Sequence, residues 1–107
     1  MNAGDFLTLM RKITDVQAHV RERGADETTD WVHSYSAVEA SSLATVLAAA
    51  AVSEKDHAAL EAQLHAILEL ASTGYVQASH IARFREIDLE EFPAPLQGYV
   101  TDLLESA

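Results

Sequence analysis

Apolar side chains recur every three or four residues along most of the chain, which is the spacing of one face of a helix. The first such stretch runs from about Asp5 to Arg23 and predicts a helix with Gly24 as its C′ residue. Its apolar positions are Phe6, Leu9, Met10, Ile13, Val16 and Val20. No segment shows convincing alternation of apolar and polar residues, the pattern of a half-buried strand. The pattern therefore predicts an all-α fold.

Two further apolar patterns predict a central pair of helices. Residues Ser36 to Glu39 have the form of a capping box, and the alanine-rich run after them predicts a helix from about 37 to 51. Ser53 is expected to cap the next helix, which carries an apolar stripe over 60–71 and ends at Thr73-Gly74. Because only two to four residues separate the two helices, we expect them to form an antiparallel hairpin.

The last third of the chain predicts shorter helices that are interrupted by prolines. Residues 77–85 are expected to turn Ile81 and Phe84 inward, and residues 88–92 fit a single helical turn. Pro95 suits the first turn of a final helix. Together the elements predict one domain over residues 1–107, a HEAT-like bundle of four to five helices around the central antiparallel hairpin.

The stretch between the first and central helices combines acidic and aromatic residues. Residues 25–30 are polar and acidic and predict a loop, and two aromatic residues follow it. These aromatic side chains fit two roles: either they cover the core, or they are partly exposed anchors of a binding patch, since aromatic residues dominate binding hot spots. The second role gives a first group of candidate partner-binding residues, Asp26, Glu27, Asp30, Trp31 and Tyr35.

The charge of the chain narrows the classes of partner. The sequence has 7 Lys and Arg against 17 Asp and Glu, a formal net charge of −10. Such a surface argues against a groove for nucleic-acid phosphates and favours a basic partner or simple solubility. From Glu86 onward there is no Lys or Arg, and this stretch fits either a solvated face or an electrostatic docking face. The docking role gives a second group of candidate residues, Glu86, Asp88, Glu90, Glu91 and Asp102.

The sequence contains few residues that are candidates for catalysis or for metal binding. The chain has no cysteine, which excludes disulfides and thiol nucleophiles. His57, Glu61 and His65 recur every four residues as zinc ligands can, but they lie on the flank of a leucine stripe and lack the HExxH pattern. We therefore expect no enzyme activity, no cofactor and no metal.

Targeting signals are also missing from the sequence pattern. The longest nearly apolar run, residues 43–52, is far below the roughly 20 residues of a membrane span. The first residues do not form a signal peptide. We expect a cytoplasmic protein without a membrane or nucleic-acid partner.

One resemblance runs through Leu64 to Glu105. A helix ends in LELASTGYV, a short helix contains FREIDLEEF, and a proline break leads to a closing GYVTDLLES. In this order of helices and proline break the chain resembles the small, acidic, HEAT-like immunity proteins of bacterial polymorphic-toxin and contact-dependent inhibition systems. The resemblance implies a cytoplasmic protein that binds one cognate toxin domain and blocks it, without catalytic residues.

The acidic charge adds the expectation that this toxin domain is basic. Blocking would be steric, and acidic side chains would speed association. Two other functions fit the same composition: a helical adaptor or small subunit of a larger assembly, and an acidic mimic of nucleic acid that occupies a DNA-binding groove.

Overall fold

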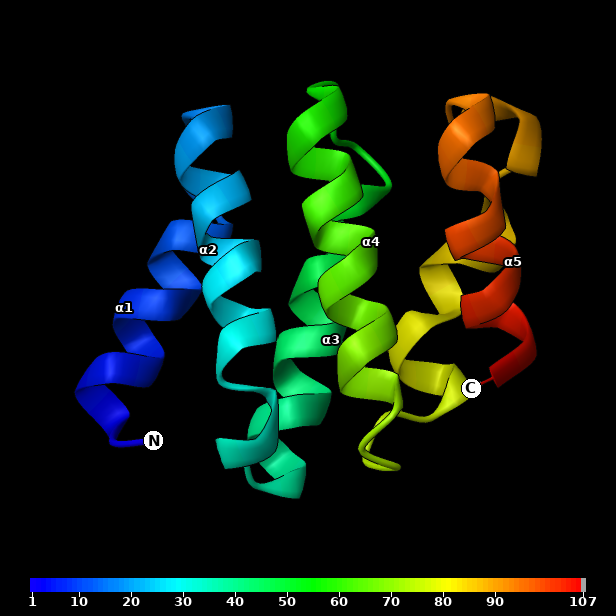
Figure 1. Cartoon of the computed structure of the whole chain (residues 1–107). Helices are drawn as coiled ribbons and strands as arrows, with labels where there is room; N and C mark the ends of the chain where they lie inside the picture. Colours follow the sequence, from blue (N-terminus) through cyan, green and yellow to red (C-terminus); the bar gives the residue numbers. More distant parts are fainter. Residues whose placement is uncertain (107) are drawn as a thin grey trace.

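Helices and 3-10 segments make up the regular structure of residues 1–106, the part of the chain that the computed structural model describes (Figure 1). This part contains no strand, so the all-α prediction is confirmed. The elements in chain order are α1 (Ala3–Ile13), α2 (Ala18–Asp30), η1 (Val32–Ser34), α3 (Ala37–Ala51), α4 (His57–Ala71), η2 (Ala78–Glu86), η3 (Leu89–Glu91), η4 (Ala94–Leu96) and α5 (Gln97–Ser106).

The predicted first helix is in fact two helices, α1 and α2, separated by residues 14–17. At this break the Thr14 hydroxyl donates to the Met10 carbonyl at 2.8 Å, and the Asp15 carboxylate accepts from the Gln17 amide at 2.9 Å. Such local side-chain bonds compete with the helical backbone bonds. The second helix then continues to Asp30, so the prediction of a loop over residues 25–30 is wrong.

Gly24 lies inside α2 rather than after a helix, so its predicted role as a C′ residue is also wrong. A Cβ atom at this position would lie 2.8 Å from the Cβ of Lys12 and 2.9 Å from the backbone nitrogen of Ile13. Only a residue without a side chain allows α1 to approach α2 this closely. The tertiary contact therefore explains the glycine.

The central helix α3 begins and ends where the sequence predicts. The Ser36 hydroxyl accepts from the Glu39 amide at 3.1 Å, and the Glu39 carboxylate accepts from the Ser36 amide at 2.9 Å, which confirms the capping box. Helix α4 begins later than predicted, because Asp56 and not Ser53 is its N-cap. The connection is therefore residues 52–56, longer than the two to four residues predicted.

Helix α4 ends at Ala71, two residues before the predicted stop at Thr73-Gly74. Gly74, with a φ of +83°, adopts the left-handed conformation just after this helix. Beyond it, η2 has a non-helical Ile81, so this segment is kinked. The inward side chains predicted here, Ile81 and Phe84, are buried.

Helix α4 is the middle of the molecule and packs against α2, α3 and α5 (Figure 1). Helix α1 lies on the outer side of α2, and the 3-10 segments η2, η3 and η4 lie at the α5 side. The largest fully buried side chains come from most elements: Ile13, Leu43, Leu47, Gln63, Leu64, Ile67, Leu70, Ile81, Phe84, Leu96, Val100 and Leu103. Within residues 1–106 no helix is long and apolar enough to cross a lipid bilayer.

Candidate functional site

The structure separates the two groups of predicted partner-binding residues. Asp26, Glu27, Asp30, Trp31 and Tyr35 lie on α2 and just after it. Glu86, Asp88, Glu90, Glu91 and Asp102 lie between the end of η2 and α5. Because α4 stands between α2 and α5, the two groups occupy different sides of the molecule (Figure 1).

The two aromatic residues of the first group have opposite environments. Trp31 is 54% exposed at the end of α2, whereas Tyr35 is only 6% exposed. The Tyr35 hydroxyl donates to the Thr28 carbonyl at 3.1 Å, and burial raises the pKa of Tyr35 to about 12. Tyr35 therefore has the core role, and it is not the exposed anchor that the other role requires. Trp31 presents its ring to solvent and can contact a partner.

The acidic residues of the first group lie on a helix and not on a loop. Asp26 and Asp30 are exposed and one turn apart on α2. Glu27 faces α1, where the Lys12 ammonium donates to its two carboxylate oxygens at 2.8 and 2.9 Å. Asp26 also lines a separate hollow of about 220 Å³ together with Glu61, His65 and Tyr99.

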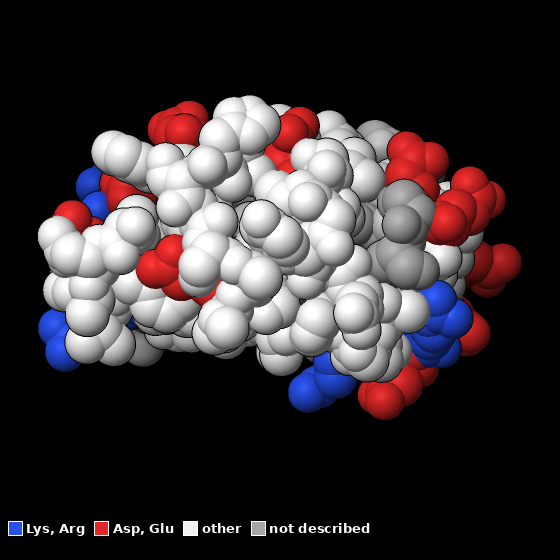
Figure 2. All heavy atoms as spheres, turned by 90° about the horizontal axis from the view of Figure 1, so that it is seen from below, with Lys and Arg blue, Asp and Glu red and all other residues white. Residues whose placement is uncertain are grey.

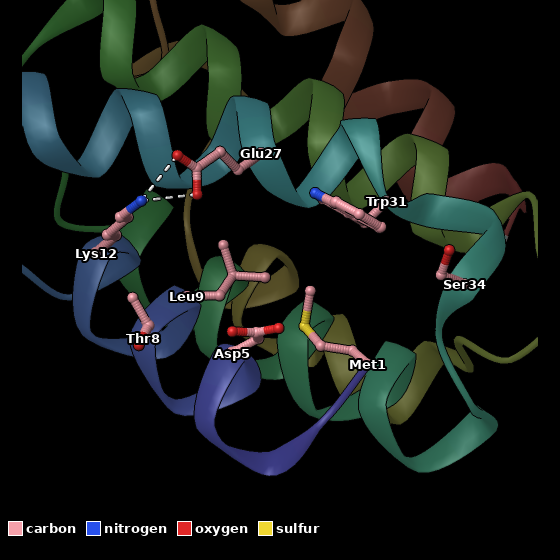
Figure 3. A pocket seen from close by; sticks show the side chains of 8 residues that line it. All are labelled: Met1, Asp5, Thr8, Leu9, Lys12, Glu27, Trp31 and Ser34. Atoms are coloured by element: carbon pink, nitrogen blue, oxygen red, sulfur yellow. Dashed lines mark hydrogen bonds and ion pairs between the residues drawn. The ribbon is translucent and has the colours of Figure 1, made fainter.

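A groove separates the beginning of α1 from the end of α2. The two helices touch at Gly24, and the space beyond this contact is a hollow of about 500 Å³. Figure 3 shows Trp31 on the α2 side of this space, with Leu9 and Asp5 on the α1 side. The ion pair between Lys12 and Glu27 spans the groove at one end (Figure 3). We call it the Trp31 groove, lined by Met1, Asp5, Thr8, Leu9, Lys12, Glu27, Trp31 and Ser34.

Sequence reasoning identified Trp31 and Glu27 but missed the contribution of α1 to this groove. The missed signal was Gly24, because residues 25–30 contain no helix-breaking proline or second glycine. An isolated glycine inside a helix-compatible stretch often marks a close packing contact. That interpretation would have paired the end of the first apolar stretch with the middle of a second helix.

The second group of acidic residues lies on an exposed surface of mixed charge. Glu86, Glu90 and Glu91 are exposed. Arg83 and Arg85 are exposed in the same 3-10 segment as Glu86. Figure 2 shows acidic and basic side chains together at the right-hand margin of the molecule. The acidic stretch seen in the sequence is thus partly balanced in space by the arginines that precede it.

Sequence reasoning also missed a buried ion pair that joins α2 to the connection before α4. The Arg21 guanidinium donates from Nε and Nη2 to the Glu54 carboxylate at 2.7 and 2.8 Å. The Glu54 side chain is only 1% exposed and also accepts from Gln63 Nε2 at 2.8 Å. The hydrogen bonds from Arg21 lower the pKa of Glu54 to about 2, and the carboxylate raises the pKa of Arg21.

This network connects elements and does not resemble a reactive centre. Arg21 comes from α2, Glu54 from the α3–α4 connection and Gln63 from α4, so the network fixes how these parts lie together. The buried Gln63 Oε1 has no hydrogen-bond partner among the described residues. Leaving this acceptor unpaired costs stability, which the bonds to Glu54 help offset.

The histidines of α4 do not converge on a common point with other ligands. His65 lies 3.3 Å from Glu69 through its Nε2, and its ring is 6.3 Å from that of Tyr99. Residues 1–106 contain no group of three or more His, Asp or Glu side chains that could hold a metal ion.

Comparisons with protein-family models, with curated proteins and with solved structures gave no match to the chain.

Proposed function

We propose that this chain is an immunity protein that binds and blocks a cognate, basic bacterial toxin domain in the cytoplasm. The observation that carries the proposal is Trp31, a large aromatic side chain that is half exposed beside a groove. Asp5 lies across the groove, and Asp30 precedes Trp31 on α2. An exposed aromatic anchor among acidic groups is suited to a basic protein surface.

The proposed mechanism is steric occlusion without chemistry on the toxin. The aromatic anchor would hold the complex together, since desolvated aromatic contacts slow dissociation. The acidic groups, including those between Glu86 and Asp102, would steer a basic partner and speed association. The resemblance of residues 64–105 to immunity proteins supports this function, and a HEAT-like arrangement of α3 and α4 is part of the proposal.

A growth assay tests the proposal. The full chain is co-expressed with the C-terminal domain of the protein that the adjacent gene encodes. If that protein is the cognate toxin, we expect growth to be restored and a stable complex to be purified. Trp31→Ala should weaken that protection. Val16→Ala is the matched control, because Val16 is 92% exposed but does not line the groove. Lack of a complex between the purified proteins would refute the proposal.

One observation favours the adaptor function as the second candidate. Residues 31–38 and 70–82 contain no Asp, Glu, Lys or Arg, and both segments belong to the end of the bundle where α2 and α4 finish. Figure 2 shows a broad area without charged side chains across the middle of this end. Depletion of charge is typical of interface cores. A neighbouring enzyme operon, and co-purification with its product, would support an adaptor or subunit instead.

A further inference from the structure

We propose that the Trp31 groove receives a short partner segment in which a large apolar side chain is flanked by arginine or lysine. The inference rests on the proposed function, because it takes the partner to be a basic protein. It adds the place of docking and the chemistry of the segment that docks.

The shape of the groove is set by the packing of two helices. Gly24 lets α2 touch α1 at Lys12 and Ile13, and the space between the helices lies beyond this contact. Its volume of about 500 Å³ falls in the range typical of pockets that bury a ligand. The contact is made by the Gly24 backbone with the Cβ of Lys12 and with the backbone nitrogen and Cγ2 of Ile13, so the approach of the two helices is set close to their backbones.

The groove has an apolar side chain on each of its two sides, among polar and charged lining residues. Leu9 is 3% exposed and lies at the inner side, while Trp31 stands opposite from the end of α2 (Figure 3). A large aliphatic or aromatic side chain placed between them would remove the exposed face of Trp31 from water. Burying such a side chain favours binding in proportion to the apolar area removed from water, and the cost of ordering the segment opposes it.

The charges at the groove select a cation beside that apolar side chain. Among the lining residues, Lys12 is already paired with Glu27, so the carboxylate of Asp5 is the remaining charged side chain. Asp5 is exposed, and it accepts one hydrogen bond from the neutral Asn2 amide at 3.0 Å. A guanidinium or ammonium group can pair with Asp5, and it can also lie on the Trp31 ring. An acidic segment would meet repulsion from Asp5 and from the net charge of −10.

The fluorescence of Trp31 can report whether the groove is occupied. Trp31 is the only tryptophan of the sequence, so intrinsic tryptophan fluorescence reports occupancy of the groove directly. The probes are three blocked peptides without tryptophan: Arg-Leu-Leu-Arg, Glu-Leu-Leu-Glu and Arg-Ser-Ser-Arg. We expect the first to shift Trp31 emission to shorter wavelength in a saturable way, and the other two to bind at least about tenfold more weakly.

A second measurement locates the binding by variant and by nuclear magnetic resonance. Amide shifts caused by Arg-Leu-Leu-Arg should cluster at Thr8, Leu9 and Trp31. Asp5→Asn should reduce the preference for the arginine peptide over the glutamate peptide, whereas Tyr75→Ala, an exposed aromatic control outside the groove, should leave that preference unchanged.

Several results would overturn the inference. An unchanged Trp31 emission at millimolar Arg-Leu-Leu-Arg would do so, as would equal binding of all three peptides or amide shifts that cluster around Glu90. If the chain protects cells but Trp31→Ala and Asp5→Asn protect equally well, the groove assignment fails and the proposed function stands. If the peptide occupies the groove but the purified chain forms no complex with the toxin domain, the proposed function fails and the groove assignment stands.

Discussion

Gly24 shows how one missing side chain determines the position of a whole helix. The glycine faces Lys12 and Ile13 across the α1–α2 contact, and the Trp31 groove opens beyond it. The sequence around Gly24 suits a helix end, since Arg21 and Arg23 precede it as basic residues often precede a C-cap. The local pattern therefore could not reveal a contact with residues eleven or twelve positions away.

The substitution Gly24→Ala tests this close approach. Alanine favours a helix by about 1 kcal/mol over glycine, but its Cβ would meet the Ile13 backbone nitrogen at 2.9 Å. We expect the clash to win and the free energy of unfolding to fall by about 1–3 kcal/mol in urea titrations.

The matched control is Gly98→Ala in α5, where an added Cβ meets no atom within 4 Å. This change should raise the free energy of unfolding by about 0.4–1 kcal/mol. If the two alanine variants were equally stabilised, the close contact of α1 with α2 would be wrong.

At the scale of elements, sequence reasoning succeeded where the signals were local. Helix α3 carries its own cap and a run of alanines, so its bounds were predicted to the residue. The start of α4 was not, because Ser53 and Asp56 are both good caps and only three residues apart. Glu54 lies between them in the sequence and forms an ion pair with Arg21, a tertiary contact that the local sequence does not reveal.

Single substitutions at the two serines test these cap assignments. Ser36→Ala should lower the free energy of unfolding by about 0.5–2 kcal/mol, because the Glu39 amide loses its acceptor. Ser53→Ala should change it by no more than about 0.5 kcal/mol, since Ser53 is exposed and only donates to the Ala50 carbonyl. Chemical denaturation followed by circular dichroism measures both. An equal loss in the two variants would contradict the start of α4 at His57.

The buried ion pair between α2 and the α3–α4 connection makes stability depend on pH. The pKa of Glu54 is lowered from 4.5 to about 2 in the folded chain, so the unfolded chain takes up this proton first as the pH falls. The stabilisation is fully present above pH 4.5 and is lost between about pH 4.5 and 2, by an amount of roughly 3 kcal/mol.

A variant isolates this contribution from that of other carboxylates. Glu54→Gln should be less stable than the wild type at pH 7, and the difference should shrink as the pH approaches 2.5 in urea titrations. Glu27→Gln is the control, because the Lys12–Glu27 pair is about one-third exposed and contributes at most about 1 kcal/mol. A gap between Glu54→Gln and the wild type that stays constant with pH would exclude Glu54 as the source.

At the scale of the whole molecule, composition indicates a class of partner, whereas the packing of the helices indicates where a partner can dock. The net charge of −10 pointed to a basic partner, and Trp31 was identified as a candidate anchor. Packing then placed Tyr35 in the core and added α1 residues to the site. Since the acidic groups of residues 86–102 lie across α4 from Trp31, they are better suited to steering than to direct contact at the groove.

Charge reversal separates steering from anchoring. Glu86, Glu90 and Glu91 are exposed, and changing all three to lysine shifts the net charge by six units, from −10 to −4. Exposed substitutions alter stability by no more than about 0.5 kcal/mol each, so the helical circular dichroism should persist. Surface plasmon resonance against the toxin domain at two salt concentrations should show an association rate about tenfold slower at low salt, with an unchanged dissociation rate. Trp31→Ala should instead mainly speed dissociation. An association rate that responds neither to salt nor to the triple reversal would show that these acids only keep the protein in solution.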